Sequence, residues 1–218
     1  MSLVDDYLES RPSKKRAKNM LYVTDLTKPC LRASMLDILH PKPYPVETLK
    51  IFESGNMIED WWVQKVLKNR IGIEVLGDQV QAYHKVGKWI IHGRVDALCL
   101  HIGEGIRVHE VKSIKNASYV RNNGAKPEHI KQIQFYLNAL GVEFGSVDYL
   151  CKHTMLNGGS DPVDVSFPVT RNPFMFSELL QHAQNLGDAV ESGEADCTPG
   201  WLCGYCQHAE TCDKGEEQ

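Results

Sequence analysis

The sequence has no long hydrophobic run. Although 42% of its 218 residues are hydrophobic, no apolar stretch approaches the roughly 18 residues that a membrane-spanning helix needs. The opening residues, MSLVDDYLES, carry acids where a secretory signal would place positive charge ahead of an apolar stretch. We therefore expect a cytoplasmic protein with no membrane partner.

Internal repeats and low-complexity segments are also absent. No G-x-x-x-x-G-K-[ST] phosphate-binding loop occurs, so the chain has no sign of a helicase motor. Its length and its charged fraction of 24% suit one α/β domain with appendages. The net charge of −4 argues against nonspecific coating of nucleic acid but does not exclude a locally basic groove.

A conspicuous basic run follows Pro12 and consists of Lys14, Lys15, Arg16 and Lys18. It belongs to an expected N-terminal basic arm with a short helix, residues 1–20. A single domain should follow over residues 21–218, including a C-terminal cysteine cluster at 197–212. The run could contact phosphates, but short basic runs are weak motifs, and a solvated arm is the simpler interpretation.

Hydrophobic periodicity predicts a mixed order of helices and strands. The expected helices cover residues 24–39, 46–70, 127–140 and 173–191. The expected strands cover residues 80–84, 89–92, 95–102, 106–112, 146–151 and 163–167. This pattern predicts an α/β fold in which a mixed central sheet is flanked by helices.

Two acids and a lysine lie on the central strands, in the segments GRVDAL and HEVKS. Side chains alternate along a strand, so Glu110 and Lys112 should project from one face about 7 Å apart. Strand pairing across the turn at 103–105 could bring Asp96 beside Glu110. Two carboxylates and a backbone carbonyl, here that of Val111, are hard oxygen ligands suited to Mg²⁺ or Mn²⁺.

A divalent metal at this place could polarise a phosphodiester and generate hydroxide from bound water. Lys112 would orient the nucleophile or stabilise charge in the transition state. The alternative is that Asp96, Glu110 and Lys112 are surface strand residues that form a cross-strand ion pair, because D…ExK is a short and permissive pattern. Gln132 and Tyr136 favour the catalytic interpretation, although an ordinary polar pair at a helix edge would share their spacing. Four residues apart on a predicted helix, they could hold the DNA backbone or a water next to the strand ends.

In this order, GRVDAL, HEVKS and QIQFY resemble motifs II, III and QxxxY of the RecB-like branch of the PD-(D/E)XK nuclease superfamily. The resemblance implies a restriction-endonuclease-like core. It also implies a catalytic role for Asp96, Glu110 and Lys112, with Gln132 and Tyr136 as helical support.

The first motif of that branch, GxxxH, departs from the pattern here. The corresponding stretch, GNMIE, runs from Gly55 to Glu59, so glutamate replaces the histidine that faces the metal. Glutamates at this motif occur elsewhere in the superfamily, and Glu59 can still ligate Mg²⁺ or Mn²⁺. The alternative is a solvated helix acid like the adjacent Asp60.

Seven cysteines in a chain without an export signal are expected to be reduced thiols or metal ligands. Cys203, Cys206 and Cys212 form a C-x2-C-x5-C segment that resembles the C-terminal motif of nucleases with a 4Fe-4S cluster. In those nucleases a fourth cysteine comes from an upstream helix, where Cys30 stands here, and the cluster would join both chain ends. A zinc knuckle would instead use Cys197 as its fourth ligand. Four thiolates suit either metal, and the accompanying nuclease motifs favour iron–sulfur.

The resemblance extends over residues 22–212 and is closest to the CRISPR-associated RecB-like exonucleases, the Cas-four family. It implies metal-dependent cleavage of single-stranded DNA, commonly 5′ to 3′, and spacer acquisition beside CRISPR integrase proteins. Viral and mobile-element homologues share these motifs, so replication or recombination is an alternative role. The rivals from other classes are a noncatalytic DNA-binding or scaffold subunit and a zinc-knuckle nucleic-acid-binding module.

Three residues in an expected loop after the catalytic strand are candidates for contact with DNA: Lys115, Tyr119 and Arg121. Tyr119 could stack on a base of single-stranded DNA, between the positive charges of its neighbours. Three other residues fall in apolar patterns and are expected in the core: Trp62, Cys99 and Cys151.

Overall fold

The computed structural model describes residues 2–11, 15–158 and 162–212. A mixed 6-stranded sheet lies at its centre, in the order β1-β3-β4-β5-β6 with β2 also paired to β3. The pairs β1–β3 and β4–β5 are parallel and the others antiparallel. The strands are β1 (Met20–Tyr22), β2 (Ile73–Val86), β3 (Trp89–His101), β4 (Gly105–Ile114), β5 (Phe144–Cys151) and β6 (Asp164–Thr170).

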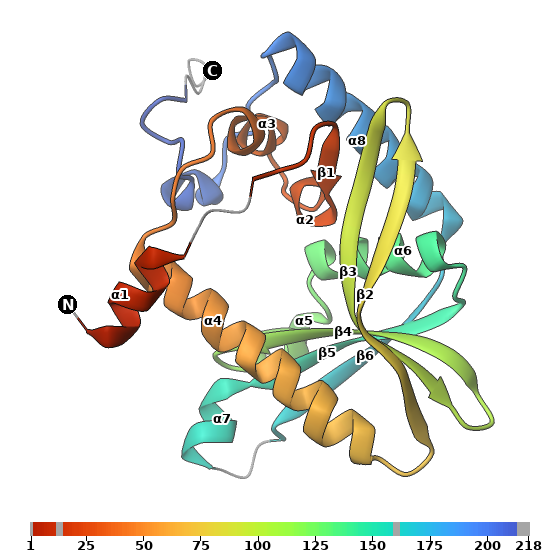
Figure 1. The fold of residues 1–218 in the computed structure, drawn as a ribbon. Helices are drawn as coiled ribbons and strands as arrows, with labels where there is room; N and C mark the ends of the chain where they lie inside the picture. The colour runs from red at the N-terminus through yellow and green to blue at the C-terminus, as the bar shows by residue number, and fades with distance from the viewer. Residues whose placement is uncertain (1, 12–14, 159–161, 213–218) are drawn as a thin grey trace.

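Helices surround this sheet, as Figure 1 shows. The α-helices are α1 (Leu3–Ser10), α2 (Val23–Leu26), α3 (Leu31–Leu39), α4 (Val46–Trp61), α5 (Ser118–Asn123), α6 (Pro127–Leu140), α7 (Lys152–Asn157) and α8 (Pro173–Ser192). A π-helical turn, η1 (Trp62–Val66), and two 3₁₀ turns, η2 (Leu67–Asn69) and η3 (Trp201–Tyr205), complete the set. The expected α/β architecture, a mixed sheet flanked by helices, is confirmed.

The two faces of the sheet bury different cores, because neighbouring strand residues point to opposite faces. Val108 packs in the larger core with α6 and α8. Val111 packs in a smaller core with η1 and η2. Trp62, Cys99 and Cys151 are buried, at 8%, 0% and 3% exposure, as their apolar patterns predict.

Strand β3 changes partners along its length, and this change creates the site described below. Its first half pairs with β1, in register at Ile90 to His92. Its last residues pair with β4, and that ladder starts at Ala97 opposite His109. Beyond this pair the β2–β3 hairpin diverges from the β4–β6 part of the sheet (Figure 1). Asp96 on β3 and Glu110 on β4 are the next residues at the fork.

Part of the N-terminal basic run contacts the folded domain and is not solvated. Lys15 and Lys18 are exposed, but Arg16 Nη1 lies 2.6 Å from Asp25 Oδ2. The Arg16 guanidinium also lies over the Tyr22 ring, 4.3 Å from its centroid. The expectation of a solvated arm is therefore wrong for Arg16. Lys14 falls outside the described residues.

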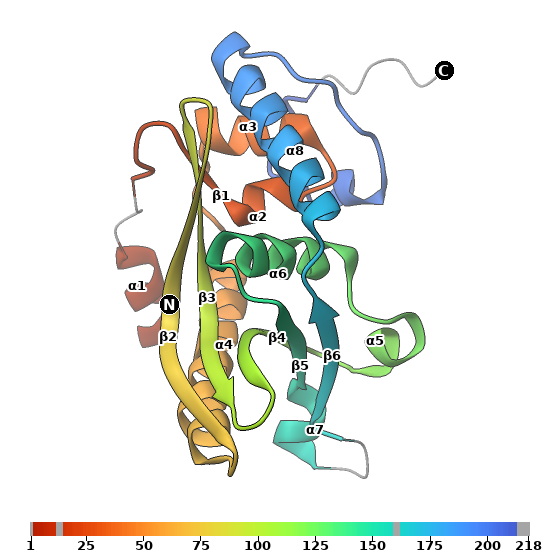
Figure 2. The same cartoon turned by 90° about the vertical axis from the view of Figure 1, so that its right-hand side faces the viewer.

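The expected helix over 24–39 is wrong in its continuity. It is interrupted between Leu26 and Leu31, giving α2 and α3, with Cys30 at the N-cap of α3. Pro29 explains the interruption, because proline lacks an N–H and disfavours helical backbone in the residue before it. The C-terminal segment after α8 returns alongside α3 (Figure 2), where Arg32 Nε donates to the Ala195 carbonyl over 2.6 Å.

Two expectations about the strands need correction. The residues expected to form separate strands at 89–92 and 95–102 belong to one continuous strand, β3. The turn before it is shorter than expected and consists of Gly87 and Lys88. Gly93 does not end a strand; an added Cβ there would lie 2.4 Å from Cε1 of Tyr136, so this glycine makes room for a neighbour. In the part of the chain that the structure describes, no helix is long and apolar enough to cross a membrane.

Candidate active site

The fork between β3 and β4 brings the two central acids together. Asp96 and Glu110 are buried, with 7% and 1% of their surface exposed. The backbone N–H of Val111 donates to Oδ2 of Asp96 over 2.8 Å. This bond ties the Asp96 carboxylate to β4 at the point where the backbone ladder has ended. The pairing proposed from the sequence, across the turn that follows His101, is the pairing observed.

Glu110 and Lys112 form an ion pair, with Nζ of Lys112 2.5 Å from Oε1 of Glu110. Oε2 of Glu110 is buried and has no hydrogen-bond partner among the described residues. A buried carboxylate oxygen left without a partner is costly, and a bound cation would remove that cost. The donor set therefore fits a hard divalent metal.

Glu59 on α4 joins the same electrostatic group. Burial, followed by the neighbouring Asp96, raises the pKa of Glu59 to about 7 against the opposing charges of Lys112 and Arg94. Burial and then Asp96 also raise the pKa of Glu110, to about 8. Asp60, the next residue on α4, is exposed. The structure thus places Glu59, and not Asp60, in the group of mutually repelling carboxylates.

Lys112 remains a cation in this environment. Burial by itself would lower its pKa, but the carboxylates of Glu110 and Asp96 outweigh burial and raise it. A permanently charged ammonium beside two carboxylates cannot act as a general base without losing its ion pairs. It can attract and orient a phosphate anion.

Helix α6 covers the fork with Gln132 and Tyr136. Nε2 of Gln132 donates to the Tyr136 hydroxyl over 2.9 Å, and both residues are buried. The phenol oxygen also bonds to the backbone of Arg94, and burial, followed by Glu110, raises the pKa of Tyr136. Since the phenol stays protonated and accepts from Gln132, its proton is available as a donor beside the acids.

Sequence reasoning missed two neighbours of these residues. Arg94 is exposed and lies close enough to lower the pKa values of Glu59 and Asp96; its place in GRVDAL was a usable signal. Gln79 on β2 bonds through its side chain to Asp96. No sequence pattern marks Gln79. Its distinguishing property is a positive backbone φ, which the residue type does not reveal.

Two of the three candidates for DNA contact, Tyr119 and Arg121, lie in helix α5 and Lys115 lies just before it, so the expected loop is wrong in part. Lys115 and Arg121 are exposed, and Tyr119 is 57% exposed. Nη2 of Arg121 donates to the Pro162 carbonyl over 3.3 Å. Tyr119 therefore has the accessible face that base stacking requires, while part of the Arg121 guanidinium is engaged in holding the chain.

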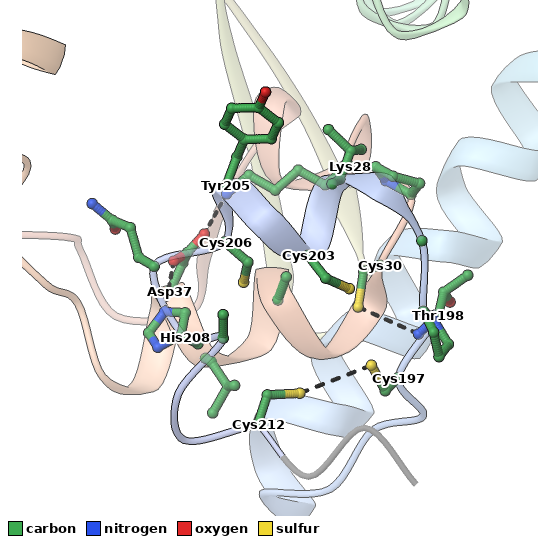
Figure 3. Close-up of a pocket in the computed structure, with 18 of the residues that line it drawn as sticks. Lys28, Cys30, Asp37, Cys197, Thr198, Cys203, Tyr205, Cys206, His208 and Cys212 are labelled. Carbon is green, nitrogen blue, oxygen red and sulfur yellow. Dashed lines mark hydrogen bonds and ion pairs between the residues drawn. The ribbon is translucent and has the colours of Figure 1, made fainter. Parts of the chain in front are cut away.

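Away from the fork, a hollow of about 420 Å³ is lined by five cysteines. Figure 3 shows them: Cys30, Cys197, Cys203, Cys206 and Cys212. Sγ of Cys212 lies 3.8 Å from Sγ of Cys197. The Thr198 N–H donates to Sγ of Cys30 over 3.5 Å. Within the described residues, no three His, Cys, Asp or Glu side chains converge tightly enough to hold a metal. Both candidate fourth ligands, Cys30 and Cys197, thus border one hollow.

The C-terminal tail is fastened to α3 at this hollow. Nε2 of His208 lies 2.8 Å from Oδ1 of Asp37, and Nζ of Lys42 donates to the Gln207 carbonyl over 2.9 Å. These contacts hold together segments that are more than 160 residues apart in the sequence. Direct protein contacts therefore join the α3 region to the C-terminal segment.

Comparison with known proteins agrees with this geometry. A family model described as "PD-(D/E)XK nuclease superfamily" matches residues 5–213. No curated protein matches the chain significantly. Among solved structures, the one described as "Crystal structure of SSO0001" is 20% identical, with a TM-score of 0.68 over 97% of this chain and 95% of that one.

Two further structures share the fold at lower identity. An alkaline exonuclease (LHK-Exo) from Laribacter hongkongensis is 13% identical, with a TM-score of 0.59 over 80% of this chain and 89% of that one. A phage related exonuclease from Haemophilus somnus 129PT is 12% identical, with a TM-score of 0.54 over 76% of this chain and 82% of that one. At these identities the likeness shows the fold alone.

Proposed function

The chain therefore belongs to the PD-(D/E)XK nuclease superfamily, and from this premise we propose that it is a Mn²⁺- or Mg²⁺-dependent exonuclease that hydrolyses single-stranded DNA from the 5′ end. The observation that carries the proposal is the fork, where Asp96 and Glu110 are buried beside Lys112 and Oε2 of Glu110 has no hydrogen-bond partner among the residues that the structure describes. Two structural neighbours described as exonucleases support the mode of attack.

We assign the metal to Asp96, Glu110 and the Val111 carbonyl, with Glu59 at its edge. When bound, the metal would polarise the scissile phosphate and activate water. Lys112 would hold the phosphate and stabilise negative charge that develops on it. Tyr136, oriented by Gln132, would donate its phenol proton to a phosphate oxygen or to water. We assign exposed Lys115, Tyr119 and Arg121 to the flanking DNA strand.

A 4Fe-4S cluster on Cys30, Cys203, Cys206 and Cys212 completes the proposal. The residues fit such a group as a donor set, since thiols from α3 and from the tail border one hollow. The cluster would brace chain ends that already touch through His208 and Asp37. As for its cellular role, we propose CRISPR spacer acquisition beside integrase proteins in the cytoplasm, or DNA processing for a virus or mobile element.

The test measures cleavage of single-stranded DNA, with one end labelled and the other blocked, with and without Mn²⁺. We expect Asp96→Ala and Lys112→Ala to lower the rate about 100-fold or more, with unchanged circular dichroism. Asp60→Ala is the matched control, because this acid lies next to Glu59 and is exposed. Blocking the 5′ end should protect the strand, whereas blocking the 3′ end should not.

A noncatalytic DNA-binding or scaffold subunit is the second candidate function. It would bind the labelled strand without shortening it in the presence of Mn²⁺. Unchanged cleavage in both Asp96→Ala and Lys112→Ala would contradict the active-site assignment itself.

A further inference from the structure

Gln79 has an unusual backbone in the middle of a long strand. It lies between the paired positions Asp78↔Ala97 and Val80↔Val95, and so directly across β2–β3 from Asp96. Its φ is +51°, in the left-handed region. A Cβ atom crowds the carbonyl oxygen in that region, so residues with side chains avoid it and glycine does not. Strand β2 nevertheless carries a long side chain there.

The Gln79 side chain contacts the active site. It hydrogen-bonds the Asp96 carboxylate, and since a carboxylate only accepts, the amide N–H₂ is the donor. Its Oε1 is buried without a hydrogen-bond partner among the described residues. Because Nε2 and Oε1 share one amide carbon, this unpaired oxygen also lies beside Asp96.

Within the described part of the chain, two acceptors without a hydrogen-bond partner therefore border Asp96, Gln79 Oε1 from β2 and Glu110 Oε2 from β4. Each alone is a cost to the folded protein. These two acceptors and the left-handed backbone of Gln79 place several unfavourable features around Asp96. Unfavourable conformations of this kind cluster at functional sites, where they take part in the mechanism. A purely structural glutamine would satisfy its own oxygen and would not need the left-handed conformation.

We propose that Gln79 is a positioning residue of the active site. Its amide N–H₂ holds the Asp96 carboxylate in the orientation that binds the divalent metal, and its Oε1 is an acceptor for water in the site. This inference rests on the proposed function, because it concerns the same metal. It adds a β2 residue to a site otherwise built from β3, β4, α4 and α6.

Glycine substitution separates this role from a structural one. Gln79→Gly removes the amide and also relieves the left-handed backbone, so its melting temperature should equal or exceed that of the wild type. Glu74→Gly is the matched control, because Glu74 is exposed on the same strand, and φ at this residue is not positive. Glycine there loosens the strand without relieving strain, so the melting temperature should fall.

Mn²⁺ binding to metal-free protein, measured by titration calorimetry without DNA, gives the decisive comparison. We expect Gln79→Gly to bind Mn²⁺ about 10-fold more weakly or worse, as loss of an outer support of a metal ligand does. Glu74→Gly should bind like the wild type. Wild-type affinity in Gln79→Gly would overturn the inference. A fall in its melting temperature as large as that of Glu74→Gly would also overturn it, by making Gln79 structural.

Mn²⁺ titration of Asp96→Ala distinguishes a failure of the inference about Gln79 from a failure of the proposed metal site. If the wild type binds Mn²⁺ and Asp96→Ala does not, the titration reports this site, and an unchanged Gln79→Gly defeats only the role of Gln79. If Asp96→Ala binds Mn²⁺ like the wild type, the metal site of the proposed function is wrong, and the inference about Gln79 fails with it.

Discussion

The Tyr136 ring occupies the space that a side chain at position 93 would need. A Cβ on Gly93 would lie 2.4 Å from Cε1 of the ring and 3.1 Å from Cγ1 of Val23. Helix α6 can therefore approach β3 closely only above a glycine. This contact sets the height of the Tyr136 hydroxyl over the fork, so a backbone position outside the acidic group helps to place a residue of the candidate site.

Gly93→Ala should displace Tyr136 and lower both stability and cleavage. Overpacking a well-packed core costs roughly 1–3 kcal/mol, which calorimetric or circular-dichroism melting would detect. Gly55→Ala is the control, since an added Cβ there meets its nearest atom at an ordinary 3.5 Å. Alanine favours helix α4, so this control should be slightly more stable than the wild type. A Gly93→Ala protein with wild-type stability and activity would contradict the close approach.

Tyr136→Phe should reduce cleavage through loss of the phenol proton, beyond any loss of stability. Removing the hydroxyl leaves buried Nε2 of Gln132 without its acceptor, a cost of roughly 1–3 kcal/mol. Tyr149→Phe provides a matched loss, because the Tyr149 hydroxyl accepts from the Lys126 N–H over 2.9 Å and contacts His129 Nδ1 at 2.7 Å.

Both variants should therefore melt at lower temperature, while only Tyr136→Phe loses the catalytic rate measured under conditions where both are folded. Equal rates in the two variants would assign Tyr136 to packing alone.

The sequence predicted those parts of the site that depend on short-range periodicity. Alternation along one strand placed Glu110 beside Lys112, and the spacing of four residues placed Gln132 beside Tyr136. The bounds of α6 followed from Pro127 at its start and Gly141, with its left-handed φ, after its end.

Other features depend on contacts between distant segments and were not visible in the sequence. From the sequence alone, Gly93 indicates the end of a strand, whereas in the structure it makes room for the Tyr136 ring. The left-handed backbone of Gln79 could not be predicted, because glutamine is not a residue type that indicates a positive φ. Likewise, spacing alone offers Cys30 and Cys197 as rival ligands, because only the folded chain brings both to the same hollow.

The metal-free protein should lose thermal stability as pH rises, and Glu59 should carry part of that dependence. Burial and Asp96 raise the pKa of Glu59 to about 7 in the folded state, from an ordinary value of 4.5. A carboxyl with a raised pKa contributes fully to stability below its unfolded pKa, and that contribution is lost as pH rises through the folded pKa. The melting temperature should therefore fall between about pH 4.5 and pH 7.

Glu59→Gln should flatten this slope in part, because Glu110, with its pKa raised to about 8, still contributes. Asp60→Asn, at the adjacent exposed position, should keep the wild-type slope. Saturating Mn²⁺ should stabilise the wild type more at the higher pH, where the carboxylates are ionised. A Glu59→Gln slope identical to that of the wild type would remove Glu59 from the acidic group.

Cys30→Ser and Cys197→Ser should differ in their effect on the metal centre. Both residues border the same hollow, but the 4Fe-4S proposal uses Cys30, whereas a local zinc knuckle uses Cys197. After anaerobic purification, we expect Cys30→Ser to lose iron, inorganic sulfide and visible absorption, and Cys197→Ser to retain them.

The alternative outcome has an equally clear physical meaning. Burial, with Cys212 and Cys30 nearby, raises the pKa of the Cys197 thiol to about 11, so this thiol resists ionisation unless a metal binds it. Zinc in place of iron, lost in Cys197→Ser and kept in Cys30→Ser, would show that the metal does ionise Cys197. The tail would then close on itself, and only contacts such as that of His208 with Asp37 would hold it to α3.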